Sequence, residues 1–185
     1  MKISISAILL FAVLLLWTNP ATGKVYLTKD DALKQAFPDA PTIDRLTLFL
    51  SDEDIKQARE LSKAKIDSKL FTYYAARGKD NEITSYAVFE SHIVRTKPEV
   101  FMVVINTKGE IDYIEILAFY EPPEFSPPKN WLDLFRGRRF DDKLRINRGI
   151  SAISGASLTS EGVTLALRNI LAIFELKIIK KEGKK

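Results

Sequence analysis

The chain has 185 residues, 46% hydrophobic and 28% charged, values that suit one globular domain with a core of its own. It contains no cysteine and one histidine, which excludes disulfides, thiolate or multi-histidine metal centres, iron–sulfur clusters and haem attached through cysteines. The net charge of +4 is mild, and no basic stripe with interleaved aromatic residues indicates a nucleic-acid partner.

The first 23 residues have the pattern of an export signal. Lys2 supplies a positive start, and residues 3–17 form an apolar run too short to favour a spanning helix. Ala21 and Gly23 then offer small side chains where a signal peptidase reads them. We therefore expect a signal peptide over 1–23, with an uncleaved anchor as the alternative. Either way, the domain is expected to be periplasmic or on the extracytoplasmic face of the membrane.

Two helices and a strand are predicted at the start of the domain. Residues 28–37 form a helix that Thr28 caps and Pro38 stops. Residues 42–50 alternate loosely between apolar and polar side chains, which indicates a strand. Ser51 then opens a second helix, to about Lys65, with an acidic variant of the capping box.

The middle of the chain is predicted to be an antiparallel sheet. The candidate strands are 70–76, 83–93, 100–106 and 111–119. Turns at 78–81 and 107–109, each containing a glycine, join them in pairs. Because residues 101–105 are almost continuously apolar, we expect their strand to be central.

A proline-rich loop over 120–128 and a short helix over 130–135 follow the strands. Trp131 and Phe135 in that helix are expected to pin the loop, or else to stack on a cofactor. A long helix is predicted from Glu161 to about Leu176, because apolar residues recur there at helical spacing. Helices packed on an antiparallel sheet give an α+β fold over 24–176, followed by a basic tail over 177–185.

The stretch 151–160, Ser-Ala-Ile-Ser-Gly-Ala-Ser-Leu-Thr-Ser, precedes or opens the last helix. Small residues let backbone approach a ligand closely, and the positive end of a helix suits a phosphate. Four hydroxyls add donors or an attachment point, those of Ser154, Ser157, Thr159 and Ser160. The alternative is that a hydroxyl here acts only as an N-cap.

Four segments, taken in order, resemble one known family. They are 91–96 (Ser-His-Ile-Val-Arg-Thr), 117–124 (Leu-Ala-Phe-Tyr-Glu-Pro-Pro-Glu), 131–137 (Trp-Leu-Asp-Leu-Phe-Arg-Gly) and 150–159. The chain is similar to the extracytoplasmic FMN-binding domain family over roughly 25–176. That family includes peripheral flavoprotein subunits of the sodium-pumping NADH:quinone oxidoreductase and of the Rnf complex, and a domain of the nitrous-oxide-respiration membrane regulator.

The resemblance implies FMN as the cofactor, attached by a phosphoester that a flavin transferase installs. The family pattern is Asp, two residues, Ser or Thr, Gly, Ala, then the Thr or Ser that carries the flavin. Ser154, Gly155 and Ala156 match it, and the acceptor position falls on Ser157, which Leu158 and Thr159 follow. The departure is Ser151, which stands where the family usually has Asp.

Two further residues are weighed for a role in the site. Arg95 lies in a family-like segment, and it either contacts the phosphate or is an ordinary arginine at a strand end. His92, the single histidine, is expected to be structural rather than catalytic.

The resemblance favours an electron carrier or redox-complex subunit over a stand-alone enzyme, with a membrane redox complex or cytochrome as partner. The basic tail offers a contact with the membrane surface. One alternative is a flavin-free binding, assembly or sensory subunit with a degenerate flavin site. A serine hydrolase is disfavoured, because the chain lacks a Gly-x-Ser-x-Gly motif.

Overall fold

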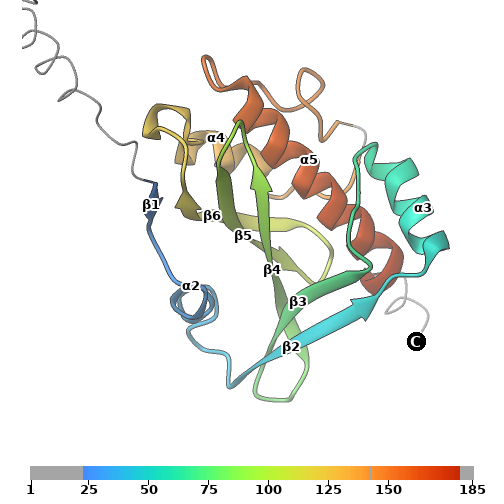
Figure 1. The fold of residues 1–185 in the computed structure, drawn as a ribbon. Coiled ribbons are helices and arrows are strands. Elements are labelled where there is room, and N and C mark those ends of the chain that lie inside the picture. Colours follow the sequence, from blue (N-terminus) through green and yellow to red (C-terminus); the bar gives the residue numbers. More distant parts are fainter. Residues whose placement is uncertain (1–22, 142, 180–185) are drawn as a thin grey trace, which may run out of the picture.

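The computed structural model describes residues 23–141 and 143–179 (Figure 1). The predicted signal peptide, except for Gly23, lies outside the described residues, as do residues 180–185 of the predicted tail. No helix in the described ranges is both long enough and apolar enough to cross a membrane.

Six antiparallel strands form one sheet in the order β1-β6-β5-β4-β3-β2, and the predicted α+β fold is confirmed. The strands are β1 (Lys24–Val25), β2 (Thr42–Phe49), β3 (Leu70–Arg77), β4 (Ile83–Ile93), β5 (Pro98–Asn106) and β6 (Ile111–Phe119). Each strand from β2 onward pairs with its sequence neighbour, and the glycine-containing turns join β3 to β4 and β5 to β6 as predicted. The strand β1 was not predicted, because two residues are too few to show a periodicity. It pairs with the end of β6.

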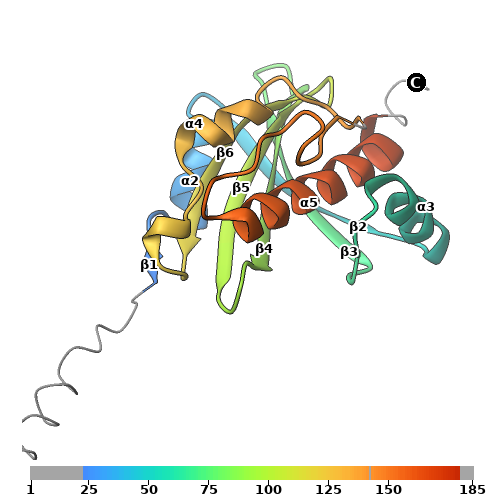
Figure 2. The same ribbon diagram turned by 90° about the horizontal axis from the view of Figure 1, so that it is seen from above.

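Helices cover both faces of the sheet (Figures 1 and 2). The helices α5 (Ser157–Phe174) and α3 (Asp52–Ser62) lie on one face, and the shorter α2 (Lys29–Ala36) lies on the other. Alternate residues of β5 therefore enter different cores. Phe101, Val103 and Ile105 belong to the core under α5, whereas Met102 and Val104 belong to the core under α2. Two-sided burial explains why the predicted central strand is apolar without interruption.

The sheet splits between β3 and β4. These strands pair only where Tyr74–Arg77 of β3 meets the first half of β4, although β3 pairs with β2 along its whole length. A groove of about 530 Å³ opens at the split, with Ala166, Asn169 and Ile170 of α5 among its lining residues. The second half of β4 forms one wall of this groove and carries His92 into it.

The capping box predicted for α3 is present. The Ser51 hydroxyl accepts from the Asp54 N–H at 3.1 Å, and the Asp54 carboxylate accepts from the Ser51 N–H at 2.9 Å. The helix ends at Ser62, three residues before the predicted end, because Lys63 adopts a left-handed conformation with φ of 57°. Lys177 also donates to both oxygens of Asp54, at 2.8 Å each.

Residues 177–179, the first part of the predicted basic tail, belong to a helical turn. Residues Glu175–Ile179 continue α5 as a single π-helical turn, η4, in which Ile178 is buried. The bond from Lys177 to Asp54 fixes this turn against α3. The first three residues of the predicted basic tail therefore pack as part of the domain.

The segment after β6 is held by its aromatic residues. It contains η2 (Pro123–Phe125), α4 (Lys129–Leu132) and η3 (Asp133–Phe135). Trp131 and Phe135 are buried and meet edge to face at 5.1 Å, which confirms them as the pins of this segment. Phe125, in the proline-rich loop, stays half-buried.

A buried arginine that the sequence analysis missed joins three segments. Arg168 of α5 is 1% exposed, and its guanidinium donates to four backbone carbonyls. Two belong to the end of α3, at Leu61 (3.0 Å) and Ser62 (2.8 Å), and two to the loop before α5, at Asp141 (3.0 Å) and Leu144 (3.1 Å). Arg168 thus fixes how α3, α5 and that loop sit together.

Candidate functional site

The last helix begins at Ser157, four residues before the predicted start at Glu161. Ala156 occupies the N-cap position, and no side chain caps the helix, so the N-cap interpretation of the hydroxyls is wrong here. The first intrahelical bond runs from the Ser160 N–H to the Ala156 carbonyl at 3.1 Å. The earlier N–H groups of the first turn therefore have no acceptor within the helix, and the positive end of its dipole is uncompensated.

The four candidate hydroxyls divide into two structural and two exposed ones. Thr159, 1% exposed, donates to the Phe125 carbonyl at 2.8 Å. Ser160, also buried, accepts from the Ile153 N–H at 2.8 Å and donates to the Ala156 carbonyl at 3.0 Å. These two side chains shape the loop and the first turn. Ser154 and Ser157 remain exposed, so an external group can reach either hydroxyl.

Ser157 opens onto a cavity of about 350 Å³. The residues that line it are Arg95, Phe125, Gly155, Ala156, Ser157, Leu158 and Thr159. The structure thus brings together every predicted site residue except Ser154, and it adds Phe125. The Arg95 guanidinium stands 4.9 Å from the centre of the Phe125 ring, so the cavity has a cation on an aromatic wall.

Gly155 gives this cavity its open backbone. Its φ is +79°, a left-handed conformation that glycine adopts without steric cost. A Cβ placed on it meets nothing within 4 Å, so the peptide there is bare on the side where a side chain would stand. A ligand group can therefore approach the backbone just before the helix begins.

Glu121 holds the two walls of the cavity together. Its carboxylate accepts from the N–H groups of Thr96 (2.6 Å) and Lys97 (2.8 Å) and from the Thr96 hydroxyl (3.1 Å). These bonds, and the one from the Thr96 N–H most of all, lower the pKa of Glu121 below its usual value. The anchor joins the turn that carries Arg95 to the loop that carries Phe125. Glu121 lies in a family-like segment, but its spacing alone does not reveal this role.

Trp131 fixes the beginning of the hydroxyl-rich loop. Its indole Nε1–H donates to the Ser151 carbonyl at 2.6 Å. The role of Trp131 is thus to hold the loop, and it does not line the cavity with Ser157. The Ser151 residue itself is exposed.

His92 lies beneath α5 and apart from this cavity. Its Nε2 is 3.4 Å from the buried carboxylate of Glu99, and Gly162 of α5 packs directly on its ring. His92 lines the groove at the sheet split, so no imidazole stands beside Ser157 to act as a general base. Within the described ranges, no group of three or more side chains suits a metal ion.

The fold and the cavity together define an α+β cofactor-binding domain that offers an anionic group a helix end, an exposed hydroxyl and an arginine. Residues 96–172 match the family model described as FMN-binding domain. That match confirms the resemblance seen in the sequence and supports FMN as the cofactor. The matched segment includes the whole stretch from Ser151 to Ser160.

A comparison with solved structures gives the same fold. The crystal structure of NqrC from Shewanella oneidensis superimposes with a TM-score of 0.59 at 16% sequence identity. The alignment covers 86% of this chain and 92% of that one. At such low identity the likeness establishes the architecture and not the activity. A search of curated proteins found no match.

Proposed function

We propose that this chain is an exported electron-transfer protein that carries FMN through a phosphoester on Ser157. The observation that carries the proposal is the placement of Ser157. Its exposed hydroxyl stands at the uncapped start of α5 and opens onto a cavity within the segment that matches the FMN-binding domain.

The residues around Ser157 fit a phosphate. The free N–H groups of the first helical turn donate to phosphate oxygens, and the helix dipole favours the negative charge. Gly155 leaves the backbone accessible, and Arg95 at the cavity wall supplies a charge-assisted donor. These groups hold the phosphate of FMN and so fix the point from which the rest of the cofactor extends.

The apolar side chains at the cavity suit the flavin ring. Phe125 lines one wall, and Leu158 is 49% exposed beside Ser157. FMN, when bound, supplies the redox chemistry, and the protein supplies position and environment. Because no histidine or carboxylate lines this cavity, the described residues hold and orient the cofactor without moving a proton for a substrate. This arrangement suits an electron relay.

Export and partners rest on the sequence. The signal-like pattern of residues 1–23 supports export to the periplasm or the extracytoplasmic face of the membrane. The resemblance to envelope flavoproteins supports a flavin transferase as the attaching enzyme. It also supports a membrane redox complex or cytochrome as the electron-transfer partner.

A second candidate function is a flavin-free assembly or sensory subunit. The observation in its favour is Ser151, which replaces the aspartate that the flavinylation pattern usually has. A transferase that reads this carboxylate attaches flavin slowly to the present chain, or fails to attach it.

Intact-mass measurement distinguishes the two functions. The chain is co-expressed with a flavin transferase, exported and weighed, and we expect the mass to rise by one esterified FMN. Ser157→Ala should abolish the increase. Ser154→Ala is the matched control, because Ser154 is equally exposed but lies outside the cavity.

The same experiment tests the role of Ser151. Ser151→Asp should raise the flavinylated fraction if the missing carboxylate limits the transferase. A mass increase that survives in Ser157→Ala but disappears in Ser154→Ala moves the attachment point to Ser154. If no variant gains mass and the purified protein holds no flavin absorbance, the flavin-free function takes the place of the first.

A further inference from the structure

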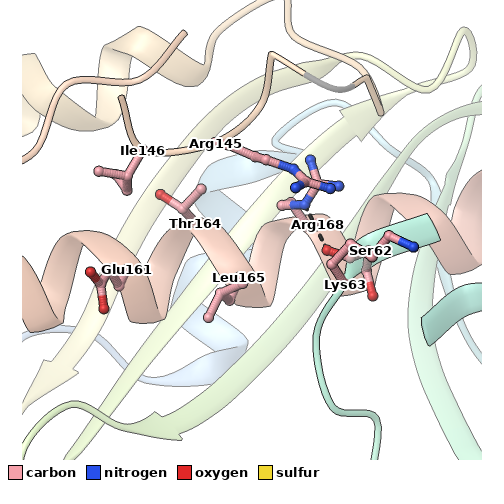
Figure 3. Close-up of a pocket in the computed structure, with 8 residues that line it drawn as sticks. All are labelled: Ser62, Lys63, Arg145, Ile146, Glu161, Thr164, Leu165 and Arg168. Atoms are coloured by element: carbon pink, nitrogen blue, oxygen red, sulfur yellow. Dashed lines mark hydrogen bonds between the residues drawn. The ribbon is translucent and has the colours of Figure 1, made fainter. Parts of the chain in front are cut away.

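A further cavity lies along α5, beyond the first helical turn that carries Ser157. It has a volume of about 250 Å³ and lies between α5, the end of α3 and the loop around Arg145 (Figure 3). We call it the basic pocket. Its lining residues are Ser62, Lys63, Arg145, Ile146, Glu161, Thr164, Leu165 and Arg168. It shares no residue with the cavity at Ser157.

The charge of the basic pocket is positive. Lys63 and Arg145 line it, and Glu161 is the one acidic residue among its lining residues. The four carbonyls bound by Arg168 hold its guanidinium in place beside them. In Figure 3 the guanidinium groups of Arg145 and Arg168 lie at one end of the cavity, and Glu161 lies at the other.

Two buried polar atoms of the basic pocket have no hydrogen-bond partner among the described residues. They are the Nε of Arg145 and the Oγ1 of Thr164, whose residue is only 2% exposed. Buried donors are nearly always satisfied, because leaving one unpaired costs the energy of removing it from water. Both atoms belong to residues that line the same cavity.

We propose that the basic pocket binds a small molecule through one oxyanion, either a carboxylate or a phosphate. Arg145 supplies charge-assisted N–H donors to this group, and the Thr164 hydroxyl supplies a further one. Ile146 and Leu165 offer apolar surface to a short carbon chain. The volume is below the ~300–1,000 Å³ of pockets that enclose drug-sized ligands, so the ligand is smaller than a nucleotide.

Glu161 disfavours a second negative charge on the ligand. Its carboxylate faces the same cavity and repels a second negative group. We therefore expect singly charged ligands to bind more tightly than doubly charged ones of the same length. Removal of the Glu161 charge should strengthen anion binding, whereas removal of the Arg145 charge should weaken it.

This site is independent of the FMN site. Ser157 and Thr164 lie on the same helix, and a rise of 1.5 Å per residue over the seven residues between them separates their backbones by about 10.5 Å along the axis. An anion that binds at the first turn of α5 therefore perturbs different residues from one that binds in the basic pocket. Binding should be the same in flavinylated and flavin-free protein.

Nitrogen-15 NMR of the mature protein tests the proposal directly. Inorganic phosphate and propionate are the probes, titrated in separate arms to about 50 mM against sodium chloride of equal ionic strength. We expect a saturable shift of the Arg145 Nε–H signal and of the Thr164 and Leu165 amides. An effect in only one arm identifies phosphate or carboxylate as the recognised group.

Three variants decide the assignment. Arg145→Gln should weaken binding about tenfold or more, the loss expected for a charge-assisted bond. Glu161→Gln should tighten it, and Lys108→Gln, which removes an exposed charge from the turn between β5 and β6, should leave it unchanged. If Arg145→Gln does not fold, Arg145→Lys takes its place, with weaker binding expected because the fork of donors is lost.

Two results overturn the proposal. One is an Arg145 Nε–H signal that neither probe shifts beyond the chloride control. The other is binding of equal strength in the wild-type protein and the folded Arg145 variant. Neither result bears on flavin attachment at Ser157, which the mass measurement decides separately.

Discussion

Glu99 is fully buried beside His92 on the strand face that α5 covers. Burial is the main cause that raises the pKa of its carboxyl above 4.5, and the nearby His92 opposes this rise. Glu90, on the same strand as His92, has its pKa raised by burial as well. The folded protein therefore favours a neutral Glu99, and the charged form lowers its stability.

The pH dependence of stability follows from the sign of this shift. Because the folded pKa of Glu99 lies above the unfolded one, its contribution is present in full below the unfolded pKa and is lost as pH rises through the folded pKa. Glu99→Gln should therefore raise the melting temperature at pH 8. The gain should shrink as pH falls towards about 4. Calorimetry of both proteins across this range measures the difference.

The control for this effect is Glu115→Gln. Glu115 lies on β6 and is exposed, so removal of its charge should produce no comparable change with pH. If Glu99→Gln lowers the melting temperature at pH 8, the attraction between His92 and Glu99 outweighs the cost of burial.

At the scale of the element, α5 and β4 lie close together at Gly162. A Cβ there would stand 2.8 Å from His92 Nε2 and 3.0 Å from Cδ2, nearer than Cβ atoms come in real structures. The imidazole has little room to move, since Glu99 and the Phe101 ring pack against it. The absence of a side chain at Gly162 lets the helix lie against the strand.

A double-mutant cycle measures this contact. In an unobstructed helix, Gly→Ala stabilises by about 1 kcal/mol. We expect Gly162→Ala to give no such gain in the wild-type protein, because His92 must shift. In a His92→Ala background, Gly162→Ala should stabilise the protein by about 1 kcal/mol. The coupling free energy between the two positions should then be at least ~0.5 kcal/mol. Equal effects in both backgrounds, measured by urea unfolding, would show that the imidazole yields freely.

The position of α5 shows what local sequence predicts and where it stops. The buried side of the helix was predicted correctly, because Val163, Leu167, Ile170 and their neighbours recur at helical spacing. The start was placed four residues late, because Ser157–Ser160 reads as polar loop. Thr159 and Ser160 satisfy their hydroxyls within the fold, and a sequence does not reveal those long-range partners.

At the scale of the whole molecule, the two faces of the sheet are unequally covered. The face under α5 has the larger core, and α3 and the segment of Trp131 add to it. The other face has α2, of eight residues, which contributes Ala32 and Leu33, with Phe37 just beyond. Helices shorter than about 12 residues are marginal alone, so α2 depends on this contact for its stability.

Hydrogen exchange should therefore resolve two levels of stability. We expect the amides of α2 to exchange through local opening, at a lower free energy than the amides of β5 and α5. Measured with rising amounts of denaturant below the unfolding transition, exchange in α2 should stay nearly constant while that of β5 accelerates. If α2 and β5 exchange with the same free energy, the domain opens as one unit.

The pairing of the strands that glycine-containing turns join followed from the sequence, and the irregularities of the sheet did not. Glycine-containing turns and alternating runs predict consecutive antiparallel strands, and the structure has them. The split between β3 and β4 and the pocket at Arg145 depend on how distant segments meet. Arg168 is an example, because its position in an apolar helix does not reveal which backbone carbonyls it binds.

The bonds of Arg168 also bear on how long the folded molecule lasts. Its partners at Leu61 and Ser62 stand 107 and 106 positions earlier in the chain, with the rest of the sheet in between. Contacts of such separation close late in folding, because the intervening chain must be ordered first. An interaction that forms after the rate-limiting step leaves the folding rate nearly unchanged and slows unfolding. The bonds of Arg168 are therefore expected to lengthen the lifetime of the native state, mainly by slowing its unfolding.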